Sequence, residues 1–284
     1  MKTHSYTFNF KTSIYLIIYS FLLIIFLITI SELFLKKFDK KYYNLFDKKS
    51  IDEDIILIGN SRTIKLQNYS KIKILNLSYN ELTQDGVIFF LETIKNKTNY
   101  SNKKIYIEIT SLQKGKVNCN FLIYRHLNYF NNEYYKSCEK DLLNTIITAN
   151  LKFNSEIFQR ILIEKILNRK KISELTISKE ICNNSILNPY DKYYQKRKNL
   201  EETIKIINTI NKKYKNVTFI ITPFINGYQV SKKIENLLIL NDIDIVQLTK
   251  ILNKNFYDDC TNFWDKSHYN HQTAKKISNF LWKN

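Results

Sequence analysis

The chain contains little glycine, proline or cysteine. Its 284 residues include four Gly, two Pro and four Cys. So few glycines and prolines exclude a collagen-like or low-complexity disordered chain. Hydrophobic residues make up 44% of the composition, which is enough to form a buried core. The length fits one domain with an appendage.

Cysteine and histidine are too scattered to form a recognisable metal cluster. The four cysteines are far apart, with no Cys-x-x-Cys pair and no Cys/His grouping of zinc spacing, at Cys119, Cys138, Cys182 and Cys260. We therefore expect neither a metal nor a cofactor. Two alternatives remain for the thiols. An oxidising compartment would permit two disulfides, of which Cys119–Cys138 closes the easiest loop, and otherwise all four cysteines are unpaired.

Acidic residues are also few relative to basic ones. Lys and Arg number 44 against 26 Asp and Glu, which gives a formal net charge of +18. Such a charge attracts nucleic acids, anionic lipid headgroups or acidic glycans. The lysines are spread along polar helix faces rather than gathered in one stripe, so we expect no nucleic-acid partner. Lipid headgroups or an acidic glycan are favoured instead.

A long apolar run lies near the N-terminus. Residues 12–35 contain only one charged side chain, Glu32. At 1.5 Å per residue, a helix over this run would cross a hydrocarbon core of about 30 Å. The run is too long for the core of a signal peptide, and no small-residue cleavage site follows it. We predict an N-terminal transmembrane helix within a membrane anchor at residues 1–36.

The charges beside the apolar run leave its orientation open. Lysines 2 and 11 precede it, whereas lysines 36, 37, 40 and 41 follow it. A literal positive-inside count would keep the rest of the chain in the cytoplasm. The whole chain is rich in lysine, which reduces the weight of this count. Residues 37–53 are charged and dotted with aromatic residues, and we interpret them as a stalk.

Short apolar runs alternate with amphipathic segments after the stalk. The runs predict buried parallel strands at Asp54–Ile58, Ile72–Leu77, Lys104–Ile109, Val217–Thr222 and Ile243–Leu248. Apolar residues at three- and four-residue spacing predict helices at Leu82–Lys95, Leu200–Tyr214 and from about Gln272 onward. This alternation indicates right-handed βαβ units. We predict an α/β domain in which helices flank both faces of a mostly parallel, five-stranded sheet.

One segment interrupts this alternation. Residues 113–198 contain a Tyr- and Asn-rich part at 118–136 and a helical pattern at about 142–169. We interpret the segment as a helical insertion. Insertions at the carboxyl end of a strand often build the substrate side of an α/β enzyme. The alternative to such an insertion or cap over the sheet edge is that the segment merely pads the sheet.

The first predicted strand ends in a sequence that can expose a serine. Gly59 permits a tight turn, and Ser61 follows at the carboxyl end of the strand, where open α/β sheets place their sites. A helix beginning over residues 62–66 would stabilise negative charge near Ser61 through its amino end. The alternative is that Asn60 and Ser61 only cap that helix.

A second polar turn precedes the last predicted helix. Asp265 lies three residues before His268, so its carboxylate can reach Nδ1 and leave Nε2 to accept a proton from a serine hydroxyl. His4 precedes the apolar run, His126 lies in the insertion, and His271 has no Asp three residues before it. We therefore prefer His268. The alternative is an ordinary surface histidine beside a capping aspartate.

These two segments resemble a known superfamily. Ile56–Arg62 resembles the first block of the SGNH (GDSL-like) hydrolases and acyltransferases, with Asn60 where Asp is usual, and Phe263–Asn270 resembles the final block. Leu75–Tyr79 resembles the second block, with Ser78 in place of the oxyanion-hole glycine. The third block should supply an Asn, but the chain reads Thr110-Ser111-Leu112. The resemblance covers about residues 52–284.

The resemblance implies both a fold and a set of roles. It implies a three-layer SGNH/flavodoxin-like domain over residues 54–284. Ser61 is then the nucleophile, His268 the general base and acid, and Asp265 its orienting partner. The backbone N–H groups of Ser61 and Ser78 would hold the oxyanion. Asn80 or a residue of the insertion would replace the missing Asn.

Membrane-anchored members with variant oxyanion holes modify cell-envelope polysaccharides. The resemblance therefore implies a single-pass, membrane-anchored serine esterase or O-acyltransferase. It would act on acyl groups, acetyl above all, of an envelope glycan through an acyl-serine intermediate. Its domain would be extracytoplasmic, in the periplasm or at the cell surface. The expected partners are the membrane, a glycan or acyl donor, and a membrane acyltransferase.

Two other functions remain open. The departures in the second and third blocks fit a catalytically degenerate SGNH fold that binds a glycan or scaffolds a membrane assembly. The Lys-rich flank of the apolar run fits a cytoplasm-facing enzyme that uses lipid-linked or small acyl donors.

Overall fold

A computed structural model describes residues 10–38, 49–66, 72–78, 82–112, 197–223, 225, 228–265 and 268–282. Five parallel strands form one sheet in the order β2-β1-β3-β4-β5. The strands are β1 (Ile55–Ile58), β2 (Ile74–Asn76), β3 (Lys104–Glu108), β4 (Val217–Ile220) and β5 (Ile245–Val246). All five lie within the predicted runs, so the prediction of a five-stranded parallel sheet is confirmed.

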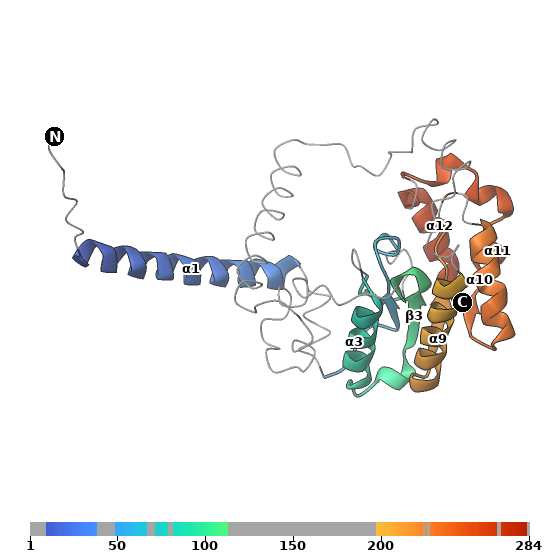
Figure 1. Cartoon of the computed structure of the whole chain (residues 1–284), viewed down its shortest axis with the longest axis horizontal. Helices are drawn as coiled ribbons and strands as arrows, with labels where there is room; N and C mark the ends of the chain where they lie inside the picture. The colour runs from blue at the N-terminus through green and yellow to red at the C-terminus, as the bar shows by residue number, and fades with distance from the viewer. Residues whose placement is uncertain are drawn as a thin grey trace.

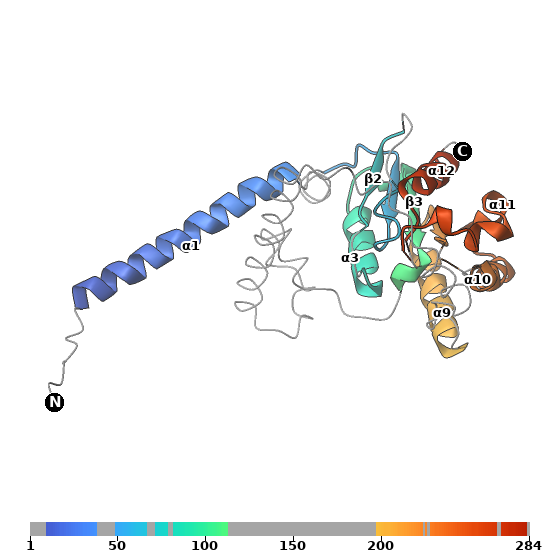
Figure 2. The ribbon, with the colours of Figure 1, turned by 90° about the horizontal axis from the view of Figure 1, so that it is seen from above.

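Helices cover both faces of the sheet. The helices of these layers are α3 (Gln84–Lys95), α9 (Arg197–Lys213), α10 (Tyr228–Leu240), α11 (Leu248–Ile251) and α12 (His271–Leu281), and a further helix, α1 (Phe10–Phe38), precedes them in the chain. Short 3-10 turns occur at η1 (Tyr100–Asn102), η2 (Ile109–Leu112), η5 (Lys254–Tyr257) and η6 (Cys260–Asn262). Helices α3, α9 and α10 pack on one face, and α11 and α12 pack on the other, as Figure 2 shows. The domain is therefore three-layered, as predicted.

The strand β1 shows why the apolar runs become central strands. Ile56 and Ile58 face the core under α3 and α9, whereas Ile55 and Leu57 face the core under α12. All four side chains are buried. A strand that is buried on both faces needs apolar residues at every position rather than at alternate ones. The continuous isoleucine and leucine run supplies them.

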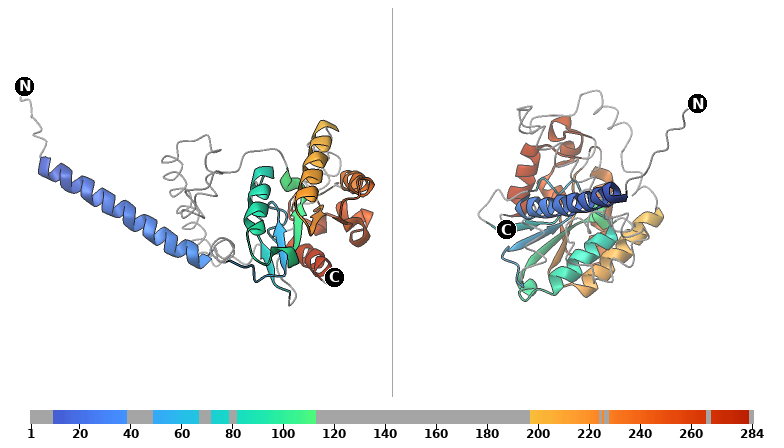
Figure 3. Two further views of the ribbon diagram at one scale, coloured as in Figure 1. Left: turned by 90° about the horizontal axis from the view of Figure 1, so that it is seen from below. Right: turned by 90° about the vertical axis from the view of Figure 1, so that its left-hand side faces the viewer.

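The structure departs from the predicted elements in two places. Helix α10 was not among the predicted elements, although Ile234 and Leu238 lie buried at helical spacing on it. The fifth strand is shorter than predicted, because Leu248 begins helix α11 instead of ending the strand. Figure 3 shows α10 beside α9 on one side of the sheet and α12 on the other.

The N-terminal apolar run forms helix α1, which projects away from the sheet (Figure 1). Its apolar side chains are exposed, with Leu16 at 63% and Ile17 at 69%. Within the described part of the chain, no helix combines the length and the apolar character that a membrane span requires. The anchor at 1–36 and the stalk at 37–53 stay predictions. Most of the predicted insertion, residues 113–196, lies outside the described residues.

Cys260 is disulfide-bonded. The other three cysteines, and the pairing expected between Cys119 and Cys138, lie outside the described residues. The alternative that all four thiols are unpaired is therefore wrong for Cys260. Disulfides persist in oxidising compartments and are rare in the cytosol.

Candidate active site

The turn at residues 59–66 leaves the carboxyl end of β1, between its parallel neighbours β2 and β3. Open α/β sheets place their sites at this edge. Gly59 begins the turn because there is no room for a side chain. A Cβ atom there would lie 2.1 Å from Thr63 Oγ1 and 2.9 Å from the Cβ of Glu108. The turn therefore folds back tightly against the end of β3.

The crowding at Gly59 predicts the result of a substitution. Gly59→Ala should lower the free energy of unfolding by about 1–3 kcal/mol, which is typical of overpacking. Urea unfolding measures this directly. Because the shortest contact is to Thr63 Oγ1, the double variant Gly59→Ala/Thr63→Ala should lose less stability than the sum of the two single variants. Strictly additive losses would contradict the steric explanation.

Residues 62–66 form hydrogen-bonded turns rather than the predicted helix, so that prediction is wrong. The backbone N–H groups of Thr63 and Leu66 donate to the carbonyl oxygens three residues earlier, those of Asn60 at 3.1 Å and Thr63 at 3.0 Å, which is the pattern of turns rather than of an α-helix. The side chain of Asn76 on β2 holds this turn, since its Nδ2 donates to the carbonyl oxygens of Thr63 at 2.9 Å and Leu66 at 2.8 Å. No helix dipole acts on Ser61 from this segment.

Asn60, rather than Ser61, caps the turn. Asn60 Oδ1 accepts a hydrogen bond from the backbone N–H of Arg62 at 3.0 Å, and Asn60 Nδ2 donates to Thr110 Oγ1. The backbone N–H of Thr63 donates to the Asn60 carbonyl at 3.1 Å. Asn60 therefore supplies the capping oxygen, and the Ser61 hydroxyl is directed elsewhere.

The Ser61 hydroxyl meets the imidazole of His268. His268 Nε2 lies 2.7 Å from Ser61 Oγ, and His268 Nδ1 lies 2.9 Å and 2.8 Å from the two carboxylate oxygens of Asp265. The backbone N–H of His268 also donates to Asp265 Oδ1 at 2.8 Å. The three side chains chosen from the sequence thus form one hydrogen-bonded chain. The His268 side chain is 23% exposed and that of Asp265 is 44% exposed, so solvent reaches both.

A short hairpin holds His268 in this position. Phe263 and Tyr269 pair as an antiparallel bridge, and both side chains are buried in the core under α12. The backbone N–H of Trp264 donates to the His268 carbonyl at 3.0 Å. Asn270 then caps α12 by accepting from the Thr273 N–H at 2.9 Å. The histidine is therefore carried on a turn that is fixed at both ends.

Lys65 and Trp264 lie beside the histidine, and sequence reasoning gave them no role. The Lys65 ammonium lies 3.8 Å from the centre of the Trp264 ring, within cation–π range. The Trp264 ring meets His268 edge-on, with 5.9 Å between ring centres. Burial lowers the pKa of Lys65, and the negative charge of Asp265 offsets part of this effect.

A buried carboxylate lies below the serine turn. Glu108, at the end of β3, is fully buried, and its Oε1 accepts hydrogen bonds from Thr222 Oγ1 at 2.8 Å and from Thr110 Oγ1. The Thr110 hydroxyl gives its proton to Glu108, so its oxygen can accept from Asn60 Nδ2. These two hydrogen bonds, from Thr110 to Glu108 and from Asn60 to Thr110, together fix the orientation of the Asn60 amide. The sequence offered one signal for this group, a glutamate at the end of a buried strand. A buried charge needs hydrogen-bond partners, so such a glutamate indicates polar neighbours.

The expected oxyanion donors are only partly present. The backbone N–H of Ser78 donates to Asn76 Oδ1 at 2.9 Å, and Ser78 Oγ accepts from Thr63 Oγ1 at 2.7 Å. This N–H is thus engaged away from the serine, contrary to the expectation. Asn80 lies outside the described residues. Over the described part of the chain, no hydrogen bond engages the Ser61 N–H, which leaves it as the available donor.

The described residues contain no group of three or more His, Cys, Asp or Glu side chains that could hold a metal ion.

Comparisons with known proteins add little to this geometry. No protein-family model and no curated protein matches the chain. Among solved structures, the chain is similar to a protein from Streptococcus pneumonia that is provisionally described as a platelet activating factor. The identity is 13%, the match covers 93% of this chain and 99% of that one, and the TM-score is 0.34.

Proposed function

We propose that this chain is a serine esterase or O-acyltransferase that works through an acyl-serine intermediate. The observation that carries the proposal is the contact of 2.7 Å between Ser61 Oγ and His268 Nε2, with the Asp265 carboxylate on the opposite ring nitrogen. A nucleophile, a base and a group that orients the base are the parts of a triad, which is recognised by geometry rather than by sequence position.

The first half-reaction follows from these contacts. Ser61 Oγ attacks the acyl carbonyl carbon while its proton passes to His268 Nε2, and Asp265 stabilises the resulting imidazolium. The Ser61 N–H donates to the developing oxyanion. When the tetrahedral intermediate collapses, Nε2 returns the proton to the leaving alcohol oxygen and the acyl group stays on Ser61. Water or a sugar hydroxyl then attacks the acyl-serine with the same proton transfers.

The number of hydrogen-bond donors at the oxyanion site affects the rate of this reaction. One missing donor typically costs about 10²–10³ in rate. Because Asn76 holds the Ser78 N–H, turnover of simple esters should be slow unless that side chain moves. A slow first half-reaction is compatible with either hydrolysis or transfer, because the two share it.

The proposed substrate is an acyl group, acetyl above all, on a cell-envelope glycan, with a membrane acyltransferase as a further partner. We propose a single-pass protein whose domain is extracytoplasmic. The disulfide at Cys260 supports an oxidising compartment. The exposed apolar side chains of α1 support attachment to a lipid phase, since such surfaces mark membrane or protein contacts.

A second candidate function is favoured by the engaged Ser78 N–H. A fold with an incomplete oxyanion site could bind a glycan or scaffold a membrane assembly without catalysis. This function predicts carbohydrate binding that His268→Ala does not change.

Covalent labelling tests the proposed function. A fluorophosphonate applied to the full-length chain should attach to one serine, found by mass spectrometry in the peptide that contains Ser61. The control Ser20→Ala, an exposed serine on α1, should label as the wild type does. Absence of labelling, or labelling that persists in Ser61→Ala, would contradict an activated serine.

A further inference from the structure

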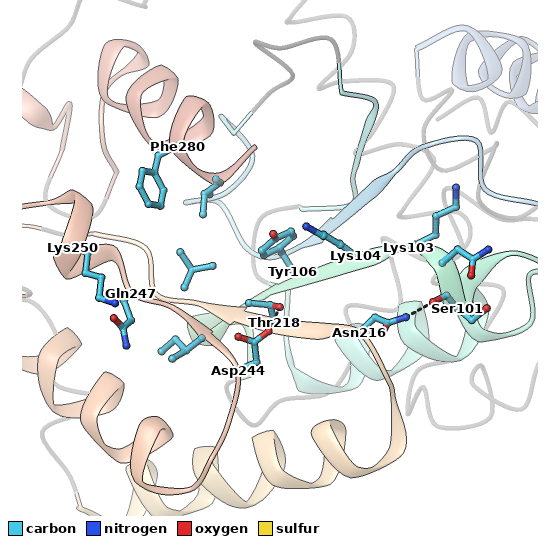
Figure 4. A pocket seen from close by; sticks show the side chains of 14 residues that line it. Ser101, Lys103, Lys104, Tyr106, Asn216, Thr218, Asp244, Gln247, Lys250 and Phe280 are labelled. Carbon is cyan, nitrogen blue, oxygen red and sulfur yellow. Dashed lines mark hydrogen bonds between the residues drawn. The ribbon is translucent and has the colours of Figure 1, made fainter. Parts of the chain in front are cut away.

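A cavity lies at the amino ends of the strands, away from Ser61. Its volume is about 800 Å³, and it opens between the end of α12 and the start of α11, over the first residues of β3, β4 and β5 (Figure 4). Cavities of about 300–1,000 Å³ hold small-molecule ligands. An inorganic anion would fill a small part of this volume, so the size favours an extended ligand.

The floor of the cavity is a polar patch of the sheet. Tyr106 on β3 and Thr218 on β4 are register neighbours, and Thr218 Oγ1 donates to Asp244 Oδ2 at 2.5 Å. The Tyr106 ring packs edge-on against Trp282, with 5.3 Å between ring centres, which fixes its position. Over the described residues, no hydrogen bond engages the Tyr106 hydroxyl. Burial, and then the charge of Asp244, raises the Tyr106 pKa, so this hydroxyl stays a donor at neutral pH.

Positive charge surrounds this floor. Lys103 and Lys104 lie at one end of the cavity and Lys250 at the other, with the Gln247 amide beside Lys250, as Figure 4 shows. Asp244 is the single carboxylate among the lining residues, and it already accepts a hydrogen bond from Thr218. Three ammonium groups against one carboxylate give the lining a net positive charge. A ligand that fits must be rich in oxygen acceptors and carry negative charge.

The remaining wall is apolar. Phe280, 39% exposed, and Leu281 come from the end of α12. Aromatic and aliphatic surface beside hydrogen-bond donors suits a sugar ring, which has C–H faces and a rim of oxygens. A bare phosphate or carboxylate would not use this surface.

We propose that this cavity binds an anionic segment of a glycan chain, as a second site apart from the acyl-transfer centre. The inference rests on the proposed function in one respect, because an enzyme acting on a charged polymer gains affinity by holding the chain outside its catalytic centre. The five residues of β3 separate the two edges of the sheet by roughly 15 Å. A polymer can span that distance, whereas a short ester cannot.

Calorimetry on the full-length chain tests the proposal. The background is Ser61→Ala, so that no turnover disturbs the titration, and the ligand is tetragalacturonate, with maltotetraose as its neutral counterpart. We expect binding of the anionic tetramer, at least tenfold weaker binding of the neutral one, and a loss of at least tenfold in Lys103→Gln/Lys250→Gln. Tyr106→Phe should weaken binding several-fold.

The matched control is Lys205→Gln/Lys212→Gln, which removes the same charge from exposed positions of α9 on the other side of the sheet. It should bind as the Ser61→Ala chain does. Absent binding, equal binding of the neutral tetramer, an equal loss in the control, or full competition by equimolar inorganic phosphate would each overturn the proposal. Binding without fluorophosphonate labelling would refute the catalytic function alone and leave this site standing.

Discussion

Replacing Ser61 by alanine should lower kcat for an acetyl ester by about 10⁴-fold or more, because the variant lacks the atom that attacks the carbonyl carbon. The His268–Asp265 pair and the rest of the turn stay in place, so the free energy of unfolding should change little. Release of p-nitrophenol from p-nitrophenyl acetate by the full-length chain measures the rate, and urea unfolding measures the stability.

Ser20→Ala controls for the loss of a serine hydroxyl at an exposed position of α1, outside the sheet domain, and it should keep the wild-type rate. A Ser61→Ala chain that retains a tenth of the wild-type kcat would show that the hydrolysis arises elsewhere on the protein. The contact between Ser61 and His268 would then be structural.

Asp265→Asn should lower kcat by about 10⁴-fold without unfolding the chain, because it forces the wrong imidazole tautomer. Asp265 Oδ1 accepts the backbone N–H of His268, so the amide oxygen of the variant should keep that place. Its NH₂ group then faces Nδ1, which becomes an acceptor. The proton moves to Nε2, which can no longer accept one from Ser61. The rate measures the loss, and the ¹⁵N chemical shifts of the ring identify the tautomer.

Asp258→Asn is the matched control, since it makes the same chemical change at an exposed position shortly before the hairpin. It should leave both the rate and the tautomer unchanged. If Asp265→Asn kept its rate within about threefold of wild type, the carboxylate would not be orienting a catalytic base.

The parts of the fold that could be predicted are those encoded locally. The run from Ile55 to Ile58 is apolar at every position, which only a strand buried on both faces requires, and Gly59 marks its end. Asp265 and His268 could be paired because three residues of a single turn separate them. Ser61 could be joined to them because it lies at the carboxyl end of the first strand and because both segments resemble blocks of one superfamily.

What could not be predicted depends on hydrogen bonds between distant segments. The turn at 62–66 is held by a β2 side chain, Asn76, which donates to two of its carbonyl oxygens. The same side chain occupies the Ser78 N–H that the family resemblance assigns to the oxyanion. Glu108 reaches Asn60 through Thr110, and no spacing in the sequence reveals that chain of bonds. In each of these cases, a hydrogen bond from a residue distant in the sequence determines the local structure.

The contact between Ser61 and His268 joins residues 207 positions apart in the chain. During synthesis the N-terminal part of a domain emerges first, and β1 with its serine is made long before the hairpin that carries the histidine. A nascent or C-terminally truncated chain would therefore hold a serine without a base. If the proposed mechanism holds, acyl transfer can begin only after the hairpin that carries His268 has been made and packed.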